Sequence, residues 1–319
     1  MSQTTYTSTE NLVLETDWLQ ALFNEIGVGP NPSSQFMQDV ELAKSLTSNA
    51  SGEVNADDQT ISKIRAIIGV SSFIKVLNRV YRRNSEWITD FVLELNKVDT
   101  PWNTTDIQSK ARNMMWEFTV ACNLSPFCHN ITRHEPDIQS TFGHNLWGTA
   151  CKVLYSRTVS QQLKQLARGA IQIEAAHVDY GCIAVDISPL LEHTKYLNLR
   201  KSGSVTYYKT YATHGEPLSM IHKDILDITA DWKRNGLWRR LTTDTKTTAD
   251  RPKTRLVVLH ANTIFINNKM PHIVSHTHIL RPRSVVGPEE DFMHAYYRAR
   301  QELASHKVDL TCGIATSKV

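Results

Sequence analysis

Polar side chains suited to one reaction centre occur on successive segments of the chain, at Glu117, Asp137, Lys152 and Gln172. Carboxylates such as those of Glu117 and Asp137 are preferred ligands of hard divalent cations, including Mg²⁺. Such a cation activates water and offsets the negative charge on the oxygens of a phosphodiester. The ammonium of Lys152 can orient that water or stabilise the charge that develops on the phosphate. Together these residue types indicate metal-assisted cleavage of a phosphodiester bond.

The segments around these residues change in hydrophobic periodicity along the chain. Helical spacing of apolar residues predicts helices, and short apolar runs predict strands. The predicted elements are a helix at 107–124, strands at 127–133, 136–141 and 146–155, a helix at 158–176 and a strand at 182–187. This order predicts an α/β sandwich with a mixed sheet, in which positions 150 and 152 share one face of a strand.

The order and spacing resemble the PD-(D/E)xK nuclease superfamily, which has the restriction-endonuclease-like fold. Pro136 and Asp137 match the "PD" of its motif, and Lys152 matches its lysine. Glu117 matches the glutamate that many members carry on the first core helix. The resemblance covers residues 107–187 and implies a core made of a mixed sheet flanked by helices.

The resemblance also implies roles for particular residues. The implied catalytic positions are Asp137, Ala150, Lys152, Glu117 and Gln172. The implied metal ligands are Asp137, Glu117 and the main-chain carbonyl of Cys151, and the implied cofactor is Mg²⁺ or Mn²⁺.

Position 150 departs from the family pattern, because it is alanine where the family carries aspartate or glutamate. Three explanations are open. The chain is an inactivated variant whose natural residue is glutamate, or Glu117 or Glu174 supplies the acid, or the domain is a natural pseudonuclease that binds without cutting. The first explanation predicts that Ala150→Glu creates a metal-dependent nuclease.

The function implied by the resemblance is that of a metal-dependent endonuclease or exonuclease, with DNA favoured over RNA as the substrate. Restriction or antiphage defence, and an ATPase or helicase partner, follow only by analogy with other nucleases of this fold. The alternative function is a non-catalytic module that binds nucleic acid or a partner protein. A cysteine–histidine hydrolase using Cys151 or Cys128 is disfavoured, because cysteines inside strands are usually structural.

Basic residues gather in two stretches, although the formal net charge is only +3. The candidate nucleic-acid contacts are Arg157, Lys164, Arg168, Lys233, Arg234, Arg239 and Arg240, and Arg251, Lys253 and Arg255 follow. Trp232 and Trp238 interleave with the second stretch and could stack on unpaired bases. The other interpretation is a solvated helix whose tryptophans face the core. Both remain open.

Histidines and cysteines form two candidate sites for a soft metal, and the sequence gives little support for either. The group Cys128, His129 and His134 has no fourth ligand at a suitable spacing. A second group is His272, His276 and His278. For this group an exposed strand face is favoured over a metal site. The five cysteines include no C-x-x-C pair, which predicts buried free thiols rather than disulfides or a zinc ribbon.

The flanking regions give fewer signals. Helices are predicted at 9–47 and 58–98, and Pro101 marks a boundary between a helical N-terminal region, 1–100, and a nuclease-like domain, 101–319. An α+β extension is predicted after 190, with helices at 218–241 and 289–306 and strands at 256–266 and 272–280. The chain shows neither a signal peptide nor an uninterrupted apolar span, which predicts a cytoplasmic protein with no membrane partner.

Overall fold

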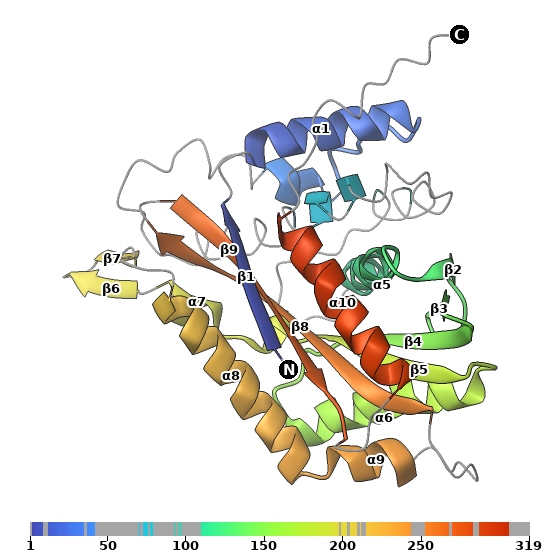
Figure 1. Ribbon diagram of the computed structural model, residues 1–319. Coiled ribbons are helices and arrows are strands. Elements are labelled where there is room, and N and C mark those ends of the chain that lie inside the picture. Colours follow the sequence, from blue (N-terminus) through green and yellow to red (C-terminus); the bar gives the residue numbers. More distant parts are fainter. Residues whose placement is uncertain are drawn as a thin grey trace.

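A mixed β-sheet forms the centre of the computed structural model (Figure 1). The structure describes residues 2–8, 12–34, 37–41, 70, 73–75, 77–78, 93, 96, 110–197, 199–202, 205–208, 211, 215–243, 253–267, 270–282 and 287–305. The sheet has seven strands in the order β1-β9-β8-β5-β4-β3-β2. Its central neighbours β4, β5 and β8 are parallel, and the other pairs are antiparallel.

The strands of this sheet are β1 (Ser2–Ser8), β2 (His129–Thr132), β3 (Ile138–Phe142), β4 (Asn145–Val153), β5 (Tyr180–Asp186), β8 (Thr254–Asn267) and β9 (Met270–Leu280). A separate two-stranded sheet consists of β6 (Leu199–Ser202) and β7 (Val205–Tyr208). The helices that the structure describes from end to end are α1 (Leu12–Glu25), α5 (Lys110–Leu124), α6 (Val159–Ala175), α7 (His193–Tyr196), α8 (Gly215–Arg234), α9 (Leu237–Thr243) and α10 (Pro288–Ser305), with a 3₁₀ turn η1 at Ser188–Leu190.

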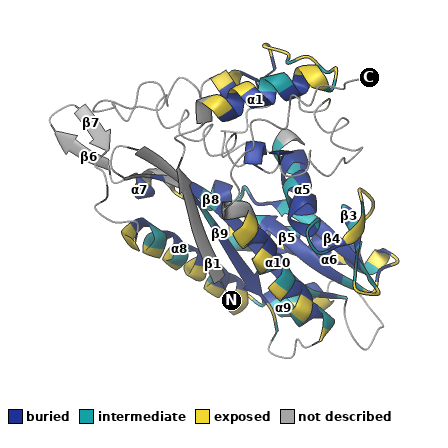
Figure 2. Ribbon diagram, turned by 45° about the horizontal axis from the view of Figure 1, so that its top comes forward, coloured by how far each residue is buried: buried dark blue, intermediate teal, exposed yellow. Residues whose placement is uncertain are grey.

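Helices cover both faces of the sheet and enclose two apolar cores. The first core joins the sheet to α5 and α10, where Phe292 stacks on Trp147 with ring centroids 4.0 Å apart. The second core joins the opposite face to α6, α8 and α9. Because strand side chains alternate between faces, Trp147 and Val153 of β4 enter the first core, while Ala150 enters the second. Figure 2 shows the central strands buried between these layers.

The order helix, strand, strand, strand, helix, strand predicted for 107–187 is confirmed as α5-β2-β3-β4-α6-β5. The predicted α/β class with a mixed sheet flanked by helices is likewise confirmed. In the extension, the predicted helix at 218–241 is two helices, α8 and α9, separated at Gly236, whose φ is +80°. The two predicted strands and the last helix are present as β8, β9 and α10.

The helical N-terminal region begins with a strand, contrary to the prediction: residues 2–8 form β1, which pairs with β9 at the edge of the sheet. Within 9–47, the described residues are helical at α1 and at 37–41. Between them, α1 ends at Glu25 and the following turn places Gly27 and Gly29 at positive φ, which glycine adopts without steric cost. Most of the predicted helix at 58–98 and the boundary near Pro101 lie outside the described residues.

No helix in the described parts of the chain is long and apolar enough to cross a membrane.

Candidate active site

The candidate site lies where β4 continues beyond its pairing with β3. The paired residues run from Phe142 opposite Asn145 to Ile138 opposite Thr149, whereas β4 itself extends to Val153. Beyond this pairing, side chains bind the main-chain groups of Cys151. The end of β3 therefore leaves peptide groups of β4 available to a functional site.

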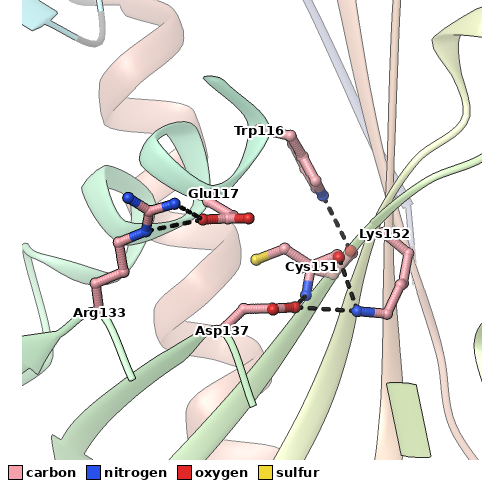
Figure 3. Close-up of polar contacts among 7 residues, drawn as sticks. Trp116, Glu117, Arg133, Asp137, Cys151 and Lys152 are labelled. Atoms are coloured by element: carbon pink, nitrogen blue, oxygen red, sulfur yellow. Dashed lines mark hydrogen bonds and ion pairs between the residues drawn. The ribbon is translucent and has the colours of Figure 1, made fainter. Parts of the chain in front are cut away.

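Asp137 and Lys152 meet at this free edge. Asp137 Oδ2 accepts a hydrogen bond from the main-chain N–H of Cys151 at 2.6 Å and lies 3.0 Å from Lys152 Nζ. Lys152 Nζ also donates to the main-chain oxygen of Cys151 at 3.0 Å. The ammonium thus bridges two oxygens, and both side chains are about one-fifth exposed, 18 % for Lys152 and 22 % for Asp137. The predicted convergence of these two residues is confirmed (Figure 3).

Glu117 approaches the same edge from α5. Its Oε2 accepts hydrogen bonds from the Arg133 guanidinium at 3.1 Å, through Nε and Nη2. Burial raises the pKa of the Glu117 carboxyl, and the negative charge of Asp137 raises it further, while Arg133 and Lys152 oppose the rise. The site therefore holds two carboxylates whose charges interact, each with a cationic partner.

The neighbouring Trp116 fixes α5 to the sheet. Its indole Nε1 donates to the main-chain oxygen of Ala184 on β5 at 3.0 Å, and its ring lies 5.0 Å from that of His260 on β8. Because Trp116 precedes Glu117 on the helix, this contact sets the position from which Glu117 reaches the site. Trp116 and Arg133 were not among the predicted site residues, although Trp116 is next to a candidate acid and Arg133 comes four residues before Asp137.

The thiol of Cys151 points from β4 toward Glu117 and Asp137 (Figure 3). Burial and these two carboxylates raise its pKa well above the ordinary value. Burial also raises the pKa of Cys128 to about 12. A nucleophilic cysteine needs a thiolate, so both environments oppose the cysteine-hydrolase interpretation.

Ala150 packs into the second core instead of contributing a polar group. Its side chain is fully buried, on the face of β4 that α6 covers. A Cβ at Gly169 of α6 would lie 3.3 Å from the Ala150 Cβ and 3.4 Å from the Lys152 Cε. Positions 150 and 152 therefore share a strand face, as predicted, but the space beside position 150 is closely filled.

Glu174 binds elsewhere. Its Oε1 accepts the main-chain N–H of Lys253 at 2.7 Å and of Thr254 at 3.3 Å, at the first residue of β8. Thr254 is opposite Gly181, near the start of β5, whereas Cys151 is opposite Ala184. Glu174 therefore anchors the other end of the parallel strands. These contacts argue against Glu174 as a substitute for an acid at position 150, and Glu117 stays a candidate for that role.

Gln172 is not joined to the candidate site by any hydrogen bond in the described part of the chain. Its Oε1 is buried and has no hydrogen-bond partner among the described residues. Gln172 lies on α6, and its catalytic role stays a prediction.

The basic stretches are mostly exposed, and of the two open interpretations of the tryptophans the structure supports the core-facing one for Trp232. The exposed candidates are Arg157, Lys164, Arg168, Lys233, Arg234 and Arg239, and Arg240 is half-buried. Trp232 is fully buried and donates from Nε1 to Gln162 Oε1 at 2.6 Å, so it cannot stack on a base. Trp238 packs against the same core.

The basic residues that follow the second stretch have partners within the chain. Lys253 binds the carbonyls of Glu174 and Ala176, and Arg255 pairs with Glu289. Arg251 lies outside the described residues.

The histidines on β9 are buried, contrary to the exposed strand face that was favoured. His276 and His278 are 1 % and 7 % exposed because α8 covers this face of β9, and the His222 ring of α8 lies 5.4 Å from that of His276. The side chain of His272 lies outside the described residues. Within the described residues, no group of three or more His, Cys, Asp or Glu side chains is arranged to hold a metal ion, which includes the region of Cys128 and His134.

Comparisons of this chain with protein-family models, with curated proteins and with solved structures found no match. The function must therefore be argued from the site itself.

Proposed function

We propose that the chain is a divalent-metal-dependent nuclease of the restriction-endonuclease-like type, with its reaction centre at the free edge of β4. One observation carries this proposal: Lys152 Nζ lies 3.0 Å from both Asp137 Oδ2 and the Cys151 carbonyl oxygen. The Asp137 carboxylate and the Cys151 carbonyl thus direct two oxygens at one cationic group, and Mg²⁺ and Mn²⁺ prefer oxygen ligands of this kind. The order α5-β2-β3-β4-α6-β5 supports the fold assignment.

The donor set fits a cation if Lys152 moves from between the two oxygens. Asp137 and the Cys151 carbonyl would hold the ion, and Glu117 would add a second carboxylate from α5. Burial is the main cause of the raised pKa of Glu117 and the Asp137 charge adds to it; a cation between the two carboxylates would favour their charged forms. Because protein donors are few, water would complete the shell, as is usual for Mg²⁺.

The bound ion would lower the pKa of a water molecule and offset charge on the phosphate. Lys152, on the same strand as Cys151, would donate hydrogen bonds to a phosphate oxygen once displaced from Asp137. Ala150 would contribute only packing against α6, and Glu117 would be the acid that position 150 lacks. DNA is the proposed substrate, and the defence role and the ATPase or helicase partner stay predictions.

A second candidate function is binding of nucleic acid without cleavage. The same contacts favour it in one respect, because the Lys152 ammonium already satisfies the oxygens that a metal would need. The fully buried Ala150 also fits a natural site that has no acid at this position.

A cleavage assay separates the two functions. The whole chain is incubated with labelled single- and double-stranded DNA and RNA in Mg²⁺, Mn²⁺ or a chelator. We expect metal-dependent cutting that Asp137→Asn, Glu117→Gln and Lys152→Met each reduce at least about 100-fold, a size typical of single catalytic groups. Glu290→Gln, which breaks the Arg281–Glu290 pair far from any proposed contact, is the matched control and should cut normally. Binding without cutting in any metal would instead establish the second function.

A further inference from the structure

Arg133 is the most exposed charged group at the candidate site. Its side chain is 61 % exposed, whereas its partner Glu117 is 22 % exposed. It directly follows β2, and the residues from Thr132 to Glu135 around it are all exposed. A long polymer can therefore reach this guanidinium without rearrangement of the core.

The ion pair between Arg133 and Glu117 does not have the strongest arginine–carboxylate geometry. Both Nε and Nη2 of Arg133 approach the same carboxylate atom, Glu117 Oε2, at 3.1 Å. The stronger arginine–carboxylate geometry engages both oxygens through two parallel hydrogen bonds. On the Arg133 side this ion pair is open to solvent, which screens it, so another anion can reach the guanidinium and compete with Glu117 for it.

Phosphate is the anion that suits this position. A guanidinium presents donors in a planar fork that matches phosphate oxygens, and it stays charged at any physiological pH. Arg133 lies beside the acid that interacts with Asp137 and Lys152, so a phosphate on Arg133 would be next to the proposed reaction centre. Nucleic-acid backbones supply such phosphates in a row.

We infer that Arg133 binds a backbone phosphate of the nucleic-acid substrate and gives up Glu117 when it does so. This inference rests on the proposed function for the identity of the substrate. The exchange would release the Glu117 carboxylate toward the cation only when substrate is present. Glu117 and the phosphate thus compete for one guanidinium, and removal of the Glu117 charge should strengthen nucleic-acid binding through Arg133.

Equilibrium binding of a fluorescent 20-nucleotide DNA, single- or double-stranded, tests the inference. Chelator is present so that no cleavage occurs, and KCl is varied. Arg133→Ala should weaken binding about 5- to 10-fold and lower the slope of log affinity against log salt by about one, because one phosphate contact is lost. Arg281→Ala, which breaks the exposed pair with Glu290, is the matched control and should change neither.

The exchange itself is tested by Glu117→Gln and by the double variant. Glu117→Gln should bind more tightly than the parent chain, and Arg133→Ala/Glu117→Gln should bind no better than Arg133→Ala alone. Equal gains from Glu117→Gln with and without Arg133 would overturn the exchange, because the effect would then be general repulsion. Unchanged affinity in Arg133→Ala, or a parent chain that binds no nucleic acid, would overturn the phosphate contact. Arg133-dependent binding without cleavage in any metal would sink the proposed catalysis and leave this inference standing.

Discussion

Ala150 and Lys152 leave β4 on the same face, and both lie against Gly169 of α6. The helix therefore packs closely on the strand that carries the candidate site. A small residue at position 150 and a glycine at position 169 permit this approach, and the aliphatic part of Lys152 fills the remaining space.

The first prediction concerns the position where the family motif has an acid. Ala150→Glu would place a carboxylate in the apolar core beside α6, and we expect it to lower the free energy of unfolding by about 3 kcal/mol, as for an uncompensated buried charge. Urea denaturation measures this effect, with Ala150→Gln as the uncharged control of equal size. If Ala150→Glu instead folds stably and cuts in Mn²⁺ where the present chain does not, alanine replaced a catalytic glutamate and the assignment of Glu117 is wrong.

The second prediction concerns the packing of α6 on β5. A Cβ at Gly181 would lie 2.2 Å from Ile173 Cγ2 and 3.1 Å from the main-chain oxygen of Gly148. Gly181→Ala should therefore destabilise the chain by about 1–3 kcal/mol through overpacking. Gly169→Ala meets its neighbours only at 3.3–3.4 Å and gains helix propensity, about 1 kcal/mol, so its net effect should be smaller. Equal thermal midpoints for the two variants would contradict this packing.

The third prediction concerns the histidines beneath α8. Burial, helped by His222 and His278, lowers the pKa of His276 from 6.5 to about 3. Burial, helped by the N-terminus, Lys233 and His222, lowers the pKa of His278 to about 4. The unfolded chain binds these protons more readily, so their contribution to stability is complete above pH 6.5 and is lost as the pH falls toward 4.

Urea denaturation from pH 7 to pH 5 measures this loss. His276→Leu and His278→Leu should each flatten the dependence of the unfolding free energy on pH by up to about 1.4 kcal/mol per pH unit, the value for one proton. Thr277→Val, at a buried position between them that does not ionise, should leave the dependence unchanged. Parallel pH profiles for all four proteins would contradict the burial of these rings.

The core from α5 to β5 could be predicted because its signals are local. Apolar periodicity identifies α5 and α6, and the strand carrying Lys152 has an apolar, β-prone composition. Asp137 and Lys152 then had to approach each other, because β3 and β4 are consecutive strands joined by a short turn at Gly143.

The features that could not be predicted depend on tertiary contacts. Strand β1 has a polar sequence, and its partners β9 and α10 both lie far away in the sequence. His276 is buried where α8 packs on β9, and Trp232 is buried in the second core, where Gln162 of another helix accepts its N–H. Glu174 looked like a possible acid until its contacts with the start of β8 were seen. Local propensity carries no information about such partners.

The central claim is that Asp137 and the Cys151 carbonyl hold a divalent cation in competition with the Lys152 ammonium. The most direct test is Mn²⁺ binding followed by electron paramagnetic resonance, alongside cleavage of DNA. Lys152→Met removes the competing ammonium and should bind Mn²⁺ several-fold more tightly than the parent chain while losing cleavage. Asp137→Asn should lose both Mn²⁺ binding and cleavage. Lys195→Met, which breaks the Lys195–Asp224 pair, should change neither Mn²⁺ binding nor cleavage. Mn²⁺ affinity that is the same in Asp137→Asn, Lys152→Met and the parent chain would contradict the claim.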